Sequence, residues 1–193
     1  IPAGWLIVSS MLARLVFVAS SVLVQVALAH AIFGTPLPSH PAAAALAFLF
    51  VAVAFLGIGL LIAALADNVP AVQALGQCIF LPMIMLGGVG VPLSVLPLWA
   101  QRVAGFMPGR YAVEVLQPCF DTSATFAVAG FRLGALAVIG LAAGISGVKL
   151  FRWETGRLRG SARWWVTAAL ASWVAVGAIA WQTGQLQPVL PET

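Results

Sequence analysis

Charge is scarce in this sequence of 193 residues: Asp, Glu, Lys and Arg together make up 7%, whereas hydrophobic residues make up 62%. A soluble domain of this size needs far more charge to cover its surface, so a soluble globular fold is excluded. Low-complexity tracts and a disordered-type composition are absent as well. The mean hydropathy is +1.08, and the surplus of apolar residues therefore has to face lipid.

The groups that carry most enzyme chemistry are also scarce. The two cysteines, Cys78 and Cys119, form no close pair and indicate neither a disulfide framework nor a thiolate metal site. The two histidines, His30 and His40, give no metal-ligand spacing. No long apolar stretch contains a carboxylate, and no glycine-rich phosphate loop followed by lysine is present. We therefore predict that the chain is not an enzyme, with no catalytic residues, no metal site and no bound cofactor.

Long apolar stretches dominate what is present. Breaks at Pro, Gly and charged residues separate five of them, at residues 11–33, 43–66, 71–91, 126–148 and 164–181. Each is near the ~20 residues that a helix needs to cross ~30 Å of hydrocarbon. Because lipid offers no partner to an open backbone group, and the ~10-residue alternating segments of a barrel are absent, helices are expected. The predicted fold class is all-α: a polytopic helical membrane protein with about five transmembrane helices.

The second and third spans are predicted to form a hairpin. Only Asp67, Asn68, Val69 and Pro70 separate them. Asn68 can cap a helix, and Pro70 suits the first helical turn.

Basic residues indicate the orientation. The densest basic cluster in the chain lies between the fourth and fifth spans. It consists of Lys149, Arg152, Arg157, Arg159 and Arg163. The positive-inside rule places this cluster in the cytoplasm. The N-terminal end is then cytoplasmic too, whereas the loops at residues 34–41 and 91–125 and the C-terminal tail face outside. We predict a multi-pass protein of a bacterial-type cytoplasmic (inner) membrane. The net charge of +4 reflects this topology, and no nucleic-acid partner is expected.

The loop between the third and fourth spans is apolar but interrupted by prolines. These are Pro92, Pro97, Pro108 and Pro118. Short helices are predicted over residues 97–106 and 110–116, and neither reaches the length that crossing requires. We expect a short re-entrant helix pair on the outer side, buried in protein or lining a cavity. Within it, Glu114 can pair with Arg110 at i,i+4. Arg132, near the outer end of the fourth span, is expected to snorkel to the surface.

A series of motifs surrounds this loop: a proline inside an apolar span, a pair of small residues, and then P-L, L-P-x-W and P-x-x-Y. The residues are Pro82, Gly87, Gly88, Pro92, Pro97, Trp99, Pro108 and Tyr111. The order and spacing of these motifs resemble those of the ABC-2 type permease family. The pair Gly87-Gly88 departs from the more usual Ser-Gly. No single piece is specific, and the weight of the resemblance lies in the ordered set.

The resemblance implies a function and partners. Such a chain is the transmembrane permease subunit of an ATP-driven exporter, dimerises with the same or another permease subunit in the lipid bilayer, and works with a separate ABC ATP-binding subunit that binds the ATP. The short helix pair would form an external gate. The main alternative is a non-transporting membrane anchor or assembly component for an extracytoplasmic domain.

The resemblance covers about residues 1–154, which we predict to be the permease transmembrane domain with its first span missing. Residues 155–193 then comprise a basic cytoplasmic loop, an extra transmembrane helix and an outward-facing tail, and the resemblance does not explain that fifth span.

Three kinds of residue inside the third span have alternative interpretations. Gln73 and Gln77 lie one turn apart and either line the substrate route or form hydrogen bonds between helices. The glycines that follow, Gly87, Gly88 and Gly90, allow close contact either at a dimer interface or gate, or within the subunit. Pro82 kinks the helix either at a gate or as a static feature.

Overall fold

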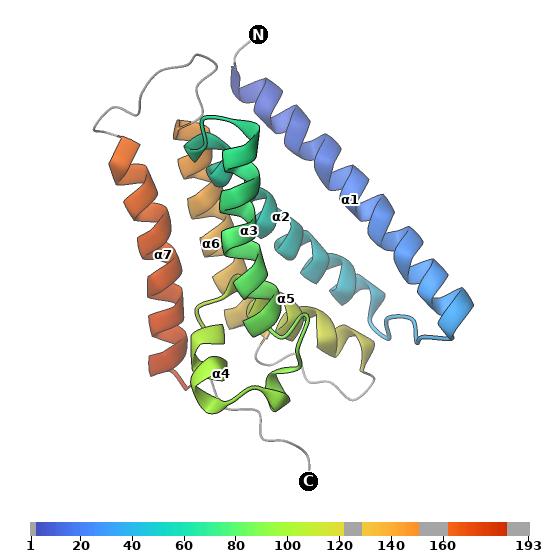
Figure 1. The fold of residues 1–193 in the computed structure, drawn as a ribbon. Coiled ribbons are helices and arrows are strands. Elements are labelled where there is room, and N and C mark those ends of the chain that lie inside the picture. The colour runs from blue at the N-terminus through green and yellow to red at the C-terminus, as the bar shows by residue number, and fades with distance from the viewer. Residues whose placement is uncertain (1–2, 122–128, 151–161, 185–193) are drawn as a thin grey trace.

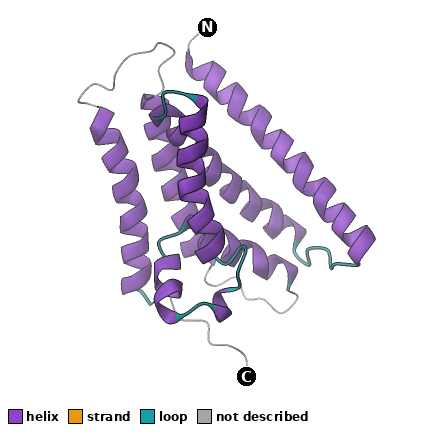
Figure 2. Ribbon diagram, in the orientation of Figure 1, coloured by secondary structure: helices purple, strands orange, loops and turns teal. Residues whose placement is uncertain are grey.

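The computed structural model describes residues 3–121, 129–150 and 162–184, and all regular structure in these ranges is helical. Loops join the helices of these ranges (Figure 2), which comprise long and short α-helices and two 3₁₀ turns. The elements in chain order are α1 (Ala3–Phe33), α2 (Pro41–Leu65), α3 (Val69–Leu86), η1 (Leu93–Val95), α4 (Leu98–Ala104), α5 (Pro108–Leu116), η2 (Gln117–Phe120), α6 (Ala129–Leu150) and α7 (Ala162–Gln182).

Five helices of the described chain are long and apolar enough to cross a membrane, which confirms the predicted fold class. The spans are Ser9–Phe33, Pro41–Leu65, Val69–Leu86, Gly130–Leu150 and Trp164–Gln182. The third span ends five residues before its predicted end. The reason is local, since Gly88 has φ +84°, a left-handed conformation that glycine adopts without the steric cost of a Cβ. The predicted start of the fourth span at residue 126 lies outside the described residues.

The turn between α2 and α3 confirms the predicted hairpin. The Asn68 side chain accepts a hydrogen bond from the backbone N–H of Ala71 at 2.9 Å, and Pro70 occupies the first turn of α3. The cap satisfies a helix-end donor that would otherwise lack a partner.

Helices α2 and α6 form the centre of the bundle, and glycines bring their backbones together. A Cβ on Gly140 would lie 2.5 Å from Ala54 Cα, and one on Gly147 would lie 2.9 Å from Leu61 N. A Cβ on Gly57 would overlap the carbonyl oxygen of Gly140. Small residues are what lets helices associate in lipid, where the hydrophobic effect supplies no force between them.

The chain alternates between the two ends of the bundle (Figure 1). The α1–α2 loop, the short helices α4 and α5, and the C-terminal end of α7 lie at one end. The α2–α3 turn, the end of α6 and the start of α7 lie at the other. This arrangement agrees with the predicted grouping of loops. Most of the predicted basic cluster lies outside the described residues.

Candidate functional site

The short-helix segment, residues 87–121, is the part of the chain that combines buried charge with irregular backbone. Its two helices are confirmed, with revised bounds: α4 has 7 residues and α5 has 9. Pro97 precedes α4 as its N-cap, and Pro108 occupies the first turn of α5, where a missing N–H costs nothing. Neither helix can cross a membrane.

A charged cluster holds α5 to its neighbours. Arg110 Nε donates to one Glu114 oxygen at 2.8 Å, which confirms the predicted i,i+4 pair. The Arg110 side chain is only 2% exposed, and its Nη1 donates to the backbone oxygen of Gln101 at 2.8 Å. A charge so deeply buried is tolerated only with such partners.

Arg132, which we expected to snorkel to the surface, forms an ion pair instead of standing alone, and its snorkelling stays a prediction. Its Nε lies 2.9 Å from the second carboxylate oxygen of Glu114, and its side chain is 24% exposed. Glu114 therefore joins two arginines, one from α5 and one from the start of α6. The cluster fastens the short-helix segment to the central bundle.

Tyr111 fixes the turn between the short helices. Its hydroxyl donates to the Gly105 carbonyl oxygen at 2.6 Å, and its ring meets Phe131 edge-on at a centroid distance of 6.4 Å. Burial raises the pKa of Tyr111 to about 12; the carboxylate of Glu114 adds to this effect and the Arg110 cation opposes it. At neutral pH the phenol is thus a hydrogen-bond donor, not a proton-transfer group.

Glycines let the end of α3 approach α5. A Cβ on Gly87 would overlap the Met83 carbonyl oxygen and lie 3.2 Å from the backbone nitrogen of Arg110. A Cβ on Gly109 would lie 2.7 Å from Met83 Cγ. These contacts favour packing within the subunit, one of the two interpretations of the Gly87–Gly90 region.

The predicted motif residues divide into two groups. Gly87, Pro108 and Tyr111 are buried and lie in the same region of the segment. The others are partly or fully exposed: Pro82, Gly88, Pro92, Pro97 and Trp99. Pro82 lies inside α3, and Pro92 precedes η1.

Gln73 and Gln77 line a groove of about 550 Å³ between α2 and α3, together with Phe55, Ile58 and Phe80. Both glutamines are exposed, and neither forms a hydrogen bond or other polar interaction within the chain's described part. The predicted hydrogen bonding between helices therefore has no partner among these residues.

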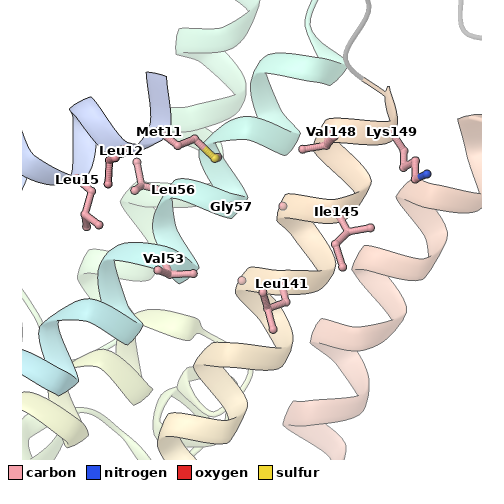
Figure 3. A pocket seen from close by; sticks show the side chains of 12 residues that line it. Met11, Leu12, Leu15, Val53, Leu56, Gly57, Leu141, Ile145, Val148 and Lys149 are labelled. Atoms are coloured by element: carbon pink, nitrogen blue, oxygen red, sulfur yellow. The ribbon is translucent and has the colours of Figure 1, made fainter. Parts of the chain in front are cut away.

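A second groove, of about 570 Å³, separates α1 from α2 and α6 (Figure 3). Apolar side chains such as Leu15, Val53 and Leu141 form its walls, and Lys149 is the one charged residue that lines it. The lining of this groove is thus almost entirely apolar. Nowhere in the described ranges do three potential metal-ligating side chains cluster.

A family model described as ABC-2 type transporter matches residues 1–120. The chain belongs to this family. The matched residues include α1, α2, α3 and the whole of the segment up to η2, so the resemblance read from the ordered motifs is confirmed. No curated protein and no solved structure matches the chain.

As an ABC-2 type transporter membrane domain, the chain has a transport role, and its family lacks ATPase activity of its own. The family generally acts with an ATP-binding subunit. The match ends at residue 120, so α6 and α7 lie beyond it.

The sequence did not predict two contacts of the Arg110–Glu114 pair in this ABC-2 type transporter. The first is the hydrogen bond from Arg110 to the Gln101 backbone oxygen, an atom that no residue pattern identifies. Arg132 is 18 residues beyond Glu114 and belongs to another helix. Only the i,i+4 spacing of Arg110 and Glu114 was a usable signal.

Proposed function

We propose that the chain is the transmembrane permease subunit of an ATP-driven exporter. It pairs with a second permease subunit, the same or different, and with an ATP-binding subunit that supplies the energy. Its basic residues and N-terminal end face the cytoplasm, and the short-helix segment is the external gate. The observation that carries this proposal is family membership combined with a polar face on α3 that has no hydrogen-bond partner within the described part of the chain.

The polar face of α3 supports a pathway between subunits. Two exposed amides one turn apart are costly in contact with lipid, because hydrocarbon offers them no hydrogen bond. Such residues in membrane helices face a bundle interior or a water-filled cavity. In this subunit Gln73 and Gln77 lack a polar partner among the described residues, so a second subunit or the aqueous pathway is the partner that we assign to them.

Thiol labelling tests the pathway assignment. The variants are Gln73→Cys and Gln77→Cys, each in a chain whose exposed Cys78 has been replaced. The control is Leu75→Cys, because Leu75 lies on another face of α3 and is 40% exposed. A charged thiol reagent is expected to label the two glutamine sites and to leave the Leu75 site unlabelled, because thiolate formation needs water. If none of the three cysteines is labelled, the glutamine positions face lipid, and the polar face of α3 no longer supports a pathway.

A reconstitution experiment tests the function itself. The full chain, co-expressed with its ATP-binding subunit and placed in lipid nanodiscs, is expected to form a stable complex that turns over ATP. A complex that never forms, with a properly folded chain, would favour the alternative of an anchor or assembly component.

A further inference from the structure

Helix α7 makes specific contacts with the short-helix segment although it lies beyond the family match. Figure 1 shows its C-terminal end beside α4. The contacting residues are Trp173, Gly177 and Trp181, spaced four apart and hence on one face of the helix. A neighbouring face, with Ala169, Val176 and Ala180, is buried, and α7 also packs along α6.

The first contact is a hydrogen bond. The indole N–H of Trp173 donates to the carbonyl oxygen of Phe106, in the turn that follows α4. Helix ends leave carbonyls without a partner in their own helix, and in a membrane each such group needs one from elsewhere.

The second contact is steric. The ring of Phe106 lies directly against Gly177, where any Cβ would overlap the ring and lie 2.9 Å from its Cγ. Only glycine at this position lets the ring approach the α7 backbone so closely. A third contact, between the Arg102 guanidinium and the Trp181 ring at 5.6 Å, adds a cation–π interaction.

The same turn is also held from inside the segment, since the Tyr111 hydroxyl bonds the carbonyl oxygen of Gly105. Residues 105 and 106 are thus fixed by one side chain from α5 and one from α7. Any movement of this turn away from α7 therefore has to break the hydrogen bond between Trp173 and Phe106.

We propose that α7 is a strap that holds the turn between α4 and α5, so that the short-helix segment opens only when α7 releases it. Trp173 and Gly177 are positioning residues for this segment. The relevance of this opening to transport rests on the proposed gate function. The restraint of the segment by α7 does not depend on that function.

The first test measures hydrogen–deuterium exchange of the amides at residues 98–107 in the full chain in nanodiscs. Trp173→Phe keeps an aromatic side chain but removes the donor. The control is Trp164→Phe, because Trp164 is 79% exposed. Exchange in the Trp173 variant is expected to rise about fivefold, the factor that one hydrogen bond contributes to an opening equilibrium. Gly177→Val, which displaces the ring, should raise it further. Unchanged exchange in both variants would overturn the strap.

The second test locks the strap. The double variant combines Phe106→Cys with Gly177→Cys in a chain whose Cys78 and Cys119 have been replaced, which places two sulfurs within disulfide reach. The control combines Phe106→Cys with Ile179→Cys. Oxidation is expected to abolish ATP turnover by the complex with the ATP-binding subunit, and reduction to restore it. Full turnover in the cross-linked complex would overturn the role of α7 in gating. Absence of turnover without any cross-link would instead overturn the proposed function, and hydrogen exchange would still decide the strap.

Discussion

At the scale of single residues, the short-helix segment holds two of the three buried polar or charged residues of the described ranges, Gln101 and Arg110, and Ser146 of α6 is the third. Throughout the described residues, no buried side-chain nitrogen or oxygen lacks a hydrogen-bond partner. Arg110 donates to the Gln101 backbone oxygen of α4, and Glu114 pairs with Arg132 of α6. Tyr111 donates to the Gly105 carbonyl oxygen in the turn after α4. Sequence spacing predicted the Arg110–Glu114 pair because both residues share one helix face. It failed for Arg132 because contact between helices follows from packing, which spacing does not encode.

The ionisation of Tyr111 is directly measurable because it is the only tyrosine in the chain. Tyrosinate absorbance of the folded protein is expected to appear with a pKa of about 12, against about 10 after denaturation. Since the folded pKa is the higher one, the stability that the phenol contributes is fully present below pH about 10 and is lost as the pH rises toward about 12. A folded protein that titrates at the denatured value would contradict the burial of Tyr111.

The substitution Glu114→Gln should destabilise the segment, because it leaves Arg110 and Arg132 without their shared carboxylate. Breaking a buried ion pair from one side costs about 3–5 kcal/mol, and the partial exposure of Arg132 and Glu114 places the expected loss near the lower value. Thermal unfolding in detergent measures it. Arg14→Gln on the exposed surface of α1 is the matched charge removal and should change stability by less than about 0.5 kcal/mol. Equal shifts in the two variants would contradict the cluster.

At the scale of helices, hydropathy predicted every span but not the packing between them. Spans are visible because crossing lipid requires length and apolarity, and these are properties of one segment. The close packing of α2 on α6 was not predicted, since Gly57 and Gly59 look alike in sequence although only Gly57 faces α6. The end of α3 was misplaced because an apolar run continues past Gly88, whose backbone conformation ends the helix.

That difference between two glycines of α2 gives a matched test. Gly57→Ala should destabilise the protein by about 1–3 kcal/mol, the usual cost of overpacking, because the new Cβ would overlap the Gly140 carbonyl. Gly59→Ala, with nothing within 4 Å of its Cβ position, should be neutral or slightly stabilising. Thermal unfolding of the two variants in the same detergent measures the difference. The reciprocal pair on α6 is Gly140→Ala against Gly134→Ala, and the structure would be contradicted if either pair showed no difference.

At the scale of the whole molecule, the membrane topology joins the fold to the proposed function. The structure groups the loops into two ends. That the end near the basic residues faces the cytoplasm stays a prediction from the positive-inside rule. The division of the chain near residue 154 stays a prediction. The contacts between α7 and Phe106 join residues on the two sides of that boundary. The last span is therefore part of the same folded body as α4 and α5.

Labelling from the two sides of the membrane tests the orientation. Thr35→Cys, in the α1–α2 loop, and Asp67→Cys, in the α2–α3 turn, are both exposed positions at opposite ends of the bundle. In a chain without Cys78 and Cys119, an impermeant thiol reagent added to intact cells should label only the Thr35 site. The Asp67 site should react only after the membrane is opened. Thr183→Cys, at the end of α7, should behave like the Thr35 site, because α7 crosses back to that end. The reverse pattern would turn the short-helix segment toward the cytoplasm, and an external gate could not be built from it.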